Sequence, residues 1–291
     1  MIAALHELQM LAQGILFQLR QIAPWWALGL LLGSLVSVYL SGSISGKMAA
    51  LSDAIPIPLG ICAASILGIL SPLCMYGTVP LIAALGRKGI RQHLLTAFMM
   101  SSILLNPNLL AVTFALGAQM ALLRLALCFF CGSLAGFLVL IFYKDKPLFR
   151  FEKFEPPPDR PKKKLLPDLW KAFRITLPYL LFGVILTALC DRYIPDSWIT
   201  ALFGANRGLG SLFATVLSIP LYACGGGTIP LVKMWLEAGM GRGEAMSFLL
   251  AGPATKINNL SAVKMILGVK NFIIYLVYSL LFAFLAGLLI P

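Results

Sequence analysis

The chain has 291 residues, of which 59% are hydrophobic and only 12% are charged, and its mean hydropathy is +0.90. This composition argues against a soluble enzyme with an ordinary buried core. The formal net charge of +12 does not indicate a nucleic-acid partner, because residues 144–171 alone hold nine Lys or Arg against five Asp or Glu.

The first segment, residues 1–23, carries too many polar side chains for a secretory signal. We expect it to form an amphipathic helix on the membrane surface. Pro24, Trp25 and Trp26 follow it and are typical of the membrane–water interface.

Eight apolar stretches of about 18 residues or more come next, each long enough to cross a hydrocarbon core about 30 Å thick. They cover residues 24–40, 57–85, 94–116, 119–143, 174–194, 209–236, 245–263 and 271–290. All eleven acidic residues lie outside these stretches or at their ends, and Lys256 is the one basic residue that we place well inside a span. The sequence therefore predicts an all-α polytopic membrane protein with about eight transmembrane segments.

Two stretches share the pattern Cys-x-x-Gly-Thr-x-Pro at a constant offset of 150 residues. The matched pairs are Cys74 with Cys224, Gly77 with Gly227, Thr78 with Thr228 and Pro80 with Pro230. We therefore expect two homologous four-segment halves with broken helices, a first membrane repeat at 24–143 and a second at 172–291. The basic, Pro-rich linker at 144–171 joins them, and its excess of Lys and Arg predicts a cytoplasmic location.

The arrangement of the halves depends on residues 57–85. If this stretch crosses the membrane, the repeats are parallel; if it re-enters, they are inverted. The arm at 58–71 would rise about 21 Å at 1.5 Å per residue, and the apolar arm at 79–86 only about 12 Å. These lengths add up to a crossing more easily than they match as a hairpin, which favours a crossing.

Each motif copy places helix breakers inside an apolar run, and paired breaks are the best sequence indication of a transporter's binding site. Thr78 can cap the helix after the first break, and Cys74 and Cys224 form a possible soft-ligand pair for Cu(I), Zn or a metalloid. Alternatively, both thiols are small buried hydrophobes. The second copy adds three consecutive glycines, Gly225, Gly226 and Gly227.

The third segment of each half has its own polar interruption. It holds Asn106, Pro107 and Asn108 in the first half, and Pro253, Lys256, Asn258 and Asn259 in the second. Both prolines should kink their helices, and the Asn amides can bridge freed backbone groups, hold a ligand or join helices. Lys256 marks a functional site by default, unless it snorkels to an interface.

The chain has no Walker A pattern, no dinucleotide fingerprint and no HExxH, so we expect no cofactor and no ATP-driven pump. The duplicated Cys-bearing breaks on an eight-segment chain with a charged linker resemble the predicted-permease family. That family includes ArsP-type efflux permeases for trivalent organoarsenicals. The resemblance implies a prokaryotic inner-membrane permease in which Cys74 and Cys224 match the family's motif cysteines. Each motif copy of this chain has a single thiol, where family members often carry a richer Cys/Ser cluster.

Three functions follow as hypotheses. The first is a secondary transporter, without enzyme activity, for a small thiophilic or anionic solute, with metalloid efflux as one case. The second is an uncoupled channel for a small solute or ion. The third, an intramembrane Cys enzyme, needs a base near the thiol, and both histidines, His6 and His93, are terminal or in a predicted loop. The expected partners are the bilayer, the solute and a possible second copy of the chain.

Overall fold

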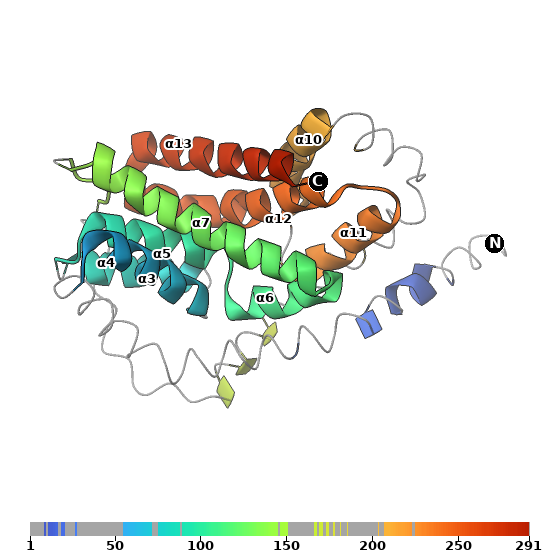
Figure 1. The fold of residues 1–291 in the computed structure, drawn as a ribbon. Helices are drawn as coiled ribbons and strands as arrows, with labels where there is room; N and C mark the ends of the chain where they lie inside the picture. The colour runs from blue at the N-terminus through green and yellow to red at the C-terminus, as the bar shows by residue number, and fades with distance from the viewer. Residues whose placement is uncertain are drawn as a thin grey trace.

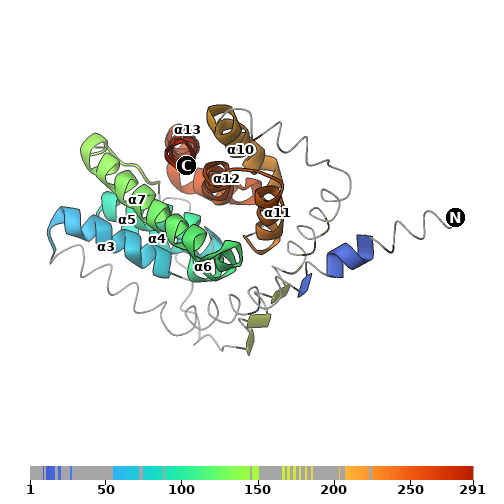
Figure 2. The same cartoon turned by 45° about the vertical axis from the view of Figure 1, so that its right-hand side comes forward.

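The computed structural model describes residues 55–71, 75–87, 89–144, 146–150, 207–222 and 225–290, with isolated positions elsewhere (Figures 1 and 2). Every regular element in these ranges is a helix. The longer helices are α3 (Ile57–Leu70), α4 (Met75–Arg87), α5 (Gln92–Leu104), α6 (Pro107–Thr113), α7 (Ala118–Phe142), α10 (Arg207–Leu221), α11 (Gly225–Glu237), α12 (Arg242–Thr255) and α13 (Ile257–Leu289). A 3-10 turn, η1 (Phe114–Leu116), follows α6.

Three stretches of the described chain are long and apolar enough to cross a membrane: Gln92–Leu116, Ala118–Phe142 and Val263–Leu289. Ile57–Leu70 and Gly208–Leu221 are shorter apolar helices. These findings confirm a polytopic helical membrane protein. The predicted spans at 24–40 and 174–194 and most of the linker lie outside the described residues, so the total of eight segments stays a prediction.

The predicted breaks occur where the helix breakers stand. Helices α3 and α4 are separate, and α10 ends at Leu221 before α11 begins at Gly225. The prediction that Pro107 kinks a helix is wrong, because Pro107 is the first residue of α6, where a backbone N–H is not needed. Pro253 lies inside α12, which continues to Thr255.

Helices α3 and α4 form a hairpin, so the expectation of a straight crossing at 57–85 is wrong. A Cβ added at Gly68 of α3 would lie 2.5 Å from the Phe98 carbonyl oxygen of α5, and one at Gly136 of α7 would touch both Ile61 and the His93 carbonyl oxygen. Both α3 and α5 therefore advance in the same direction, antiparallel to α7. Thr78 at the start of α4 contacts Ser102 near the end of α5, and α4 ends at Arg87, shortly before α5 begins at Gln92, so α4 packs on α5 and runs antiparallel to α5 and α3. The lengths of the arms at 58–71 and 79–86 could not predict the direction in which the two helices pack.

The second half has the same course. A Cβ added at Gly210 of α10 would lie 3.0 Å from Glu244 of α12, and the Tyr222 ring after α10 covers Gly252 further along α12, so these helices are parallel. Trp235, near the end of α11, lies against Phe203, just before α10 (ring centroids 5.7 Å apart). Helices α10 and α11 therefore also form a hairpin.

Helix α13 is two helices joined at Gly268, whose φ of 70° favours glycine. Its second part runs antiparallel to α12, because Ser247 donates to the Ala283 carbonyl (3.0 Å) and Tyr275 donates to the Ala254 carbonyl (2.9 Å). It is also antiparallel to α7. In Figure 1, the chain colour of the two helices advances in opposite directions along their axes. Tyr278 of α13 donates to the Cys131 carbonyl of α7 (2.6 Å). Tyr143, which follows Cys131 by twelve residues, donates to Asn271, which precedes Tyr278 (3.0 Å).

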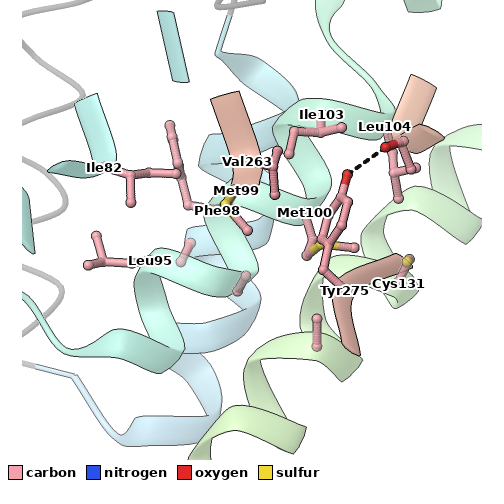
Figure 3. Close-up of a cluster of buried hydrophobic side chains, with 14 of the residues drawn as sticks. Ile82, Leu95, Phe98, Met99, Met100, Ile103, Leu104, Cys131, Val263 and Tyr275 are labelled. Carbon is pink, nitrogen blue, oxygen red and sulfur yellow. Dashed lines mark hydrogen bonds between the residues drawn. The ribbon is translucent and has the colours of Figure 1, made fainter. Parts of the chain in front are cut away.

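Two apolar clusters join the halves. One contains Ile82 of α4, Met99 of α5 and Val263 of α13 (Figure 3). The other contains Val112 of α6 together with Val232 of α11. The core therefore includes contacts between the second arm of each hairpin, α4 or α11, and the other half.

Candidate functional site

The structure describes part of the predicted site. Cys74 and Cys224 lie outside the described residues, so the soft-ligand pair stays a prediction. Gly77, Gly225, Gly226 and Gly227 belong to the first turns of α4 and α11, Pro80 and Pro230 to their second turns, and Asn258 and Asn259 to the first turn of α13. Among the predicted site residues, the structure describes the side chains of Thr78, Thr228, Pro230, Asn106, Asn108 and Lys256.

The first broken helix is tied to α5 by a pair of hydroxyls. Thr78 is fully buried, and its Oγ1 lies 3.0 Å from the Ser102 Oγ, which is also buried. This hydrogen bond fixes the first turn of α4 beside the C-terminal end of α5. Because each hydroxyl both donates and accepts, the pair satisfies part of the hydrogen-bonding capacity of both groups.

Thr228 lacks the equivalent partner. Its side chain is buried, yet Oγ1 makes no hydrogen bond within the described part of the chain. The residue 150 positions after Ser102 is Gly252, which has no side chain to offer, and the Tyr222 ring occupies the space next to it. An unsatisfied buried hydroxyl costs about 1–3 kcal/mol, so the hydrogen-bonding capacity of the Thr228 hydroxyl is unused in this arrangement.

Asn106 has a defined structural role. Its Oδ1 accepts a hydrogen bond from the Leu109 backbone N–H (2.8 Å), which caps the N-terminus of α6. The prediction that Asn amides bridge freed backbone groups is confirmed at this position. Asn108 is half-buried on the first turn of α6.

Lys256 lies in the break between α12 and α13. Its backbone is non-helical (φ −53°, ψ 123°), and its side chain is half-buried. The Leu260 N–H donates to the Lys256 carbonyl (3.1 Å), as the Leu110 N–H donates to the Asn106 carbonyl (2.8 Å). A cation in the second half thus stands at the sequence position where the first half has a neutral helix cap.

The breaks of the two halves approach each other through their helices. Helix α4 packs on α13, which begins after Lys256, and α11 packs on α6, which begins after Asn106. Helices α5 and α12 are also in contact. The arm that carries Thr78 and the arm that carries Thr228 therefore each contact the helix that follows the second break of the opposite half.

Arg124 is the residue that our sequence analysis missed. It lies six residues into the span at 119–143, and it is completely buried. Its Nη1 donates to the Thr113 hydroxyl of α6 (2.8 Å) and its Nη2 to the Leu249 carbonyl of α12 (3.0 Å), while Nε has no partner among the described residues. One guanidinium therefore joins the first half to the second. The signal was available, since a buried charge in a span is costly and must be paired.

The acceptor of Arg124 is available because of a proline. In an α-helix the Leu249 carbonyl would accept from the N–H of residue 253, but that residue is Pro253, which has none. The guanidinium replaces the missing helical hydrogen bond. The pairing therefore depends on residues 125 positions apart in the chain, and no local pattern predicts it.

A well-formed cavity lies away from the predicted site. A cavity of about 720 Å³ opens between α5, α7 and α13, and its lining includes Met99, Phe142, Lys146, Lys270 and Tyr278 but none of the predicted site residues. In addition, no group of three His, Cys, Asp or Glu that could hold a metal occurs among the described residues.

Membrane-spanning helices with paired interruptions define a multi-pass helical membrane protein. The model of a family described as predicted permeases matches residues 5–291, and the chain belongs to this predicted-permease family. It is therefore a membrane permease by family.

Relatives support the same class. The UPF0718 protein YcgR of Bacillus subtilis is 24% identical over 92% of each chain. The UPF0718 protein MJ0584 of Methanocaldococcus jannaschii is 28% identical over 45% of this chain and 37% of its own length. A Streptococcus mutans protein whose name describes a subunit of a two-component membrane permease complex is 26% identical over 83% of this chain and 81% of its own length. No solved structure matches the chain.

The link between Arg124 and Pro253 is testable by a double-mutant cycle. Pro253→Ala supplies an N–H to the Leu249 carbonyl, so Arg124→Met should destabilise the protein less in that background than in the wild type. We expect a coupling of about 1 kcal/mol or more in the free energy of unfolding, measured in detergent. Pro220→Ala is the control, because Pro220 lies inside α10 and should combine additively with Arg124→Met. Additivity with Pro253→Ala would contradict the pairing.

Proposed function

We propose that this permease is a secondary transporter that carries a small thiophilic or anionic solute between its two halves, with a trivalent organoarsenical as the first candidate. The orphan hydroxyl of Thr228 is the observation that carries the proposal, because a buried polar group without a partner in the first turn of a broken helix suits a transient ligand. Lys256 stands one helical turn beyond Gly252, the residue matched to the partner of Thr78.

An internal repeat underlies this site. Helices α3, α4, α5 and α6 begin at residues 57, 75, 92 and 107, and α10, α11, α12 and α13 begin at 207, 225, 242 and 257, a difference of 150 in every case. Gly89 and Gly239, which follow α4 and α11, also differ by 150 and share a positive φ. We take 24–143 and 172–291 as the two repeats.

The repeats are inverted in this proposal. Helix α7 is matched to the second part of α13, and these two helices are antiparallel. A hairpin at α3–α4 and another at α10–α11 would each re-enter the membrane from opposite sides. Inverted repeats with discontinuous helices that meet near the bilayer midplane are a recurrent transporter architecture.

The distribution of charge gives an orientation. We call the end of the molecule where α7 finishes the linker face, and the end where α7 starts the far face. Among the described residues, the basic residues at the linker face include Arg87, Arg91, Lys144, Lys146, Arg150 and Lys270, whereas the far face has Arg207, Lys233 and Arg242 together with Glu237 and Glu244. Cytoplasmic loops carry the excess of Lys and Arg, so we assign the linker face and the 144–171 linker to the cytoplasm of a prokaryotic cell, and the protein to its inner membrane.

A growth screen followed by reconstitution tests the function. A strain that lacks the gene would be exposed to methylarsenite, arsenite, Cu(I) and phosphate, with and without the plasmid-borne protein. Any compound that the protein makes the cells tolerate is then assayed in proteoliposomes with and without a proton gradient. Accumulation driven by the gradient supports a secondary transporter; equilibration alone would support the alternative, an uncoupled channel. Chemical conversion of the compound would instead identify an enzyme.

Thr228→Val tests the orphan hydroxyl. We expect at least a tenfold loss of transport of the compound found in the screen, without loss of thermal stability, because no hydrogen bond is removed. Thr78→Val is the matched control: it breaks the bond to Ser102 and should cost about 1 kcal/mol of stability. Transport at the wild-type rate by Thr228→Val would rule out a substrate contact at this residue.

Lys256→Met tests whether the half-buried cation acts on substrate. The variant retains much of the side-chain length and removes the charge, so it should insert normally and lose transport. Lys256→Arg retains the charge with a different shape and should be partly active at most. If Lys256→Met transports normally, Lys256 is an interfacial anchor.

The orientation predicts a labelling pattern. With the wild type as the blank for native cysteines, a membrane-impermeant maleimide should label Arg242→Cys in intact spheroplasts. Lys144→Cys should be labelled only after permeabilisation. The reverse pattern would invert the assignment of the faces.

A further inference from the structure

The cavity between α5, α7 and α13 has an amphipathic lining. Lys146, Arg150 and Lys270 stand at its linker-face end and are all exposed, whereas Leu138, Phe142 and Ile274 form an apolar wall. No acidic residue occurs among the described residues that line it. A ligand that combines a negative head with an apolar tail matches both ends of this surface.

The cavity opens towards lipid. Phe142 and Ile274 are large apolar side chains with 70% and 45% of their surface exposed, and they belong to α7 and α13, two helices that can span the membrane. An aqueous solute would have to cross this apolar surface to enter. In a bilayer, lipid acyl chains would lie alongside it.

The polar groups deeper in the cavity have partners within the protein. Tyr143 pairs with Asn271, Asn271 donates to the Leu148 carbonyl (2.8 Å), and Tyr278 and Tyr275 donate to backbone carbonyls. The three basic side chains at the rim are therefore the groups left to bind a charged ligand. Arg150 is held in place there, since its N–H donates to the Ile266 carbonyl (2.7 Å) and its guanidinium lies next to Gly268.

We propose that this cavity binds one anionic phospholipid of the cytoplasmic leaflet, with the headgroup at Lys146, Arg150 and Lys270 and an acyl chain along Phe142 and Ile274. The assignment to the cytoplasmic leaflet rests on the orientation given above, in which the linker face is cytoplasmic. Basic pockets between transmembrane helices on that side are suited to anionic headgroups. The volume of about 720 Å³ lies in the range of small-molecule sites and far exceeds the space one oxyanion needs.

Lipid binding to the purified full-length protein tests the proposal without any transport assay, so its failure is distinct from failure of the transport function. Protein in neutral detergent is titrated with phosphatidylglycerol or phosphatidylcholine, and bound lipid is counted by native mass spectrometry. We expect the wild type to retain phosphatidylglycerol in preference to phosphatidylcholine. Lys146→Gln combined with Lys270→Gln should weaken that binding by about fivefold per lysine, roughly 25-fold in total.

The control is Lys144→Gln combined with Lys264→Gln. Both lysines are exposed and outside the lining of this cavity, and the variant has the same net charge as the test variant. It should bind phosphatidylglycerol like the wild type. Ile274→Trp, which fills the apolar part, should also lose the lipid while its thermal unfolding remains cooperative.

Three results would overturn the proposal. Equal binding by the test and control variants would place the headgroup elsewhere. Competition by inorganic phosphate at concentrations equal to those of the lipid would indicate a free-anion site. Absence of preferential binding to the wild type would mean that something other than an anionic lipid, such as another part of this chain, occupies the cavity.

Discussion

The structure depends on one constraint: in an apolar environment every backbone group released by a helix break must find a partner. Arg124 donates to the Leu249 carbonyl that Pro253 leaves free, and Tyr275 donates to the Ala254 carbonyl at the end of α12. Asn106 accepts from a backbone N–H in the first turn of α6. Asn106 lies next to the break that it caps, whereas Arg124 and Tyr275 reach α12 from α7 and α13. The backbone groups at these interruptions are thus paired by side chains.

Small residues determine how the helices are stacked. An added methyl group at Gly68, Gly136 or Gly243 would collide with a backbone carbonyl of a neighbouring helix or come within about 3 Å of it. This close approach is typical of helix association in membranes, where van der Waals packing replaces the hydrophobic effect. It brings α3 against α5 and α7, and α12 against the second part of α13.

The two halves differ at the proposed binding positions. Thr78 has Ser102 as a partner, whereas the residue matched to Ser102 in the second half is Gly252 and Thr228 has no partner among the described residues. The helix cap Asn106 is matched by Lys256. A symmetric scaffold with asymmetric polar groups can bind an asymmetric solute in one orientation. The cavity at α7 and α13 is separate from these breaks and its apolar wall is exposed, so it is better suited to a lipid than to the transported solute.

The sequence by itself determined that the protein lies in a membrane, that it is helical, where its helices break and to which family it belongs. Hydropathy and helix breakers act locally, so the breaks before α4 and α11 could be predicted without any tertiary information, although Pro107 begins a helix and does not kink one. Only the tertiary structure decided the hairpin course of α3 and α4, the burial of Arg124 and the isolation of Thr228. Each of these depends on residues far along the chain. The hairpin course depends on glycines that let a neighbouring helix approach, the burial of Arg124 on a carbonyl that a proline leaves free, and the isolation of Thr228 on a hydroxyl that is missing from α12. Such residues come together only when the helices pack.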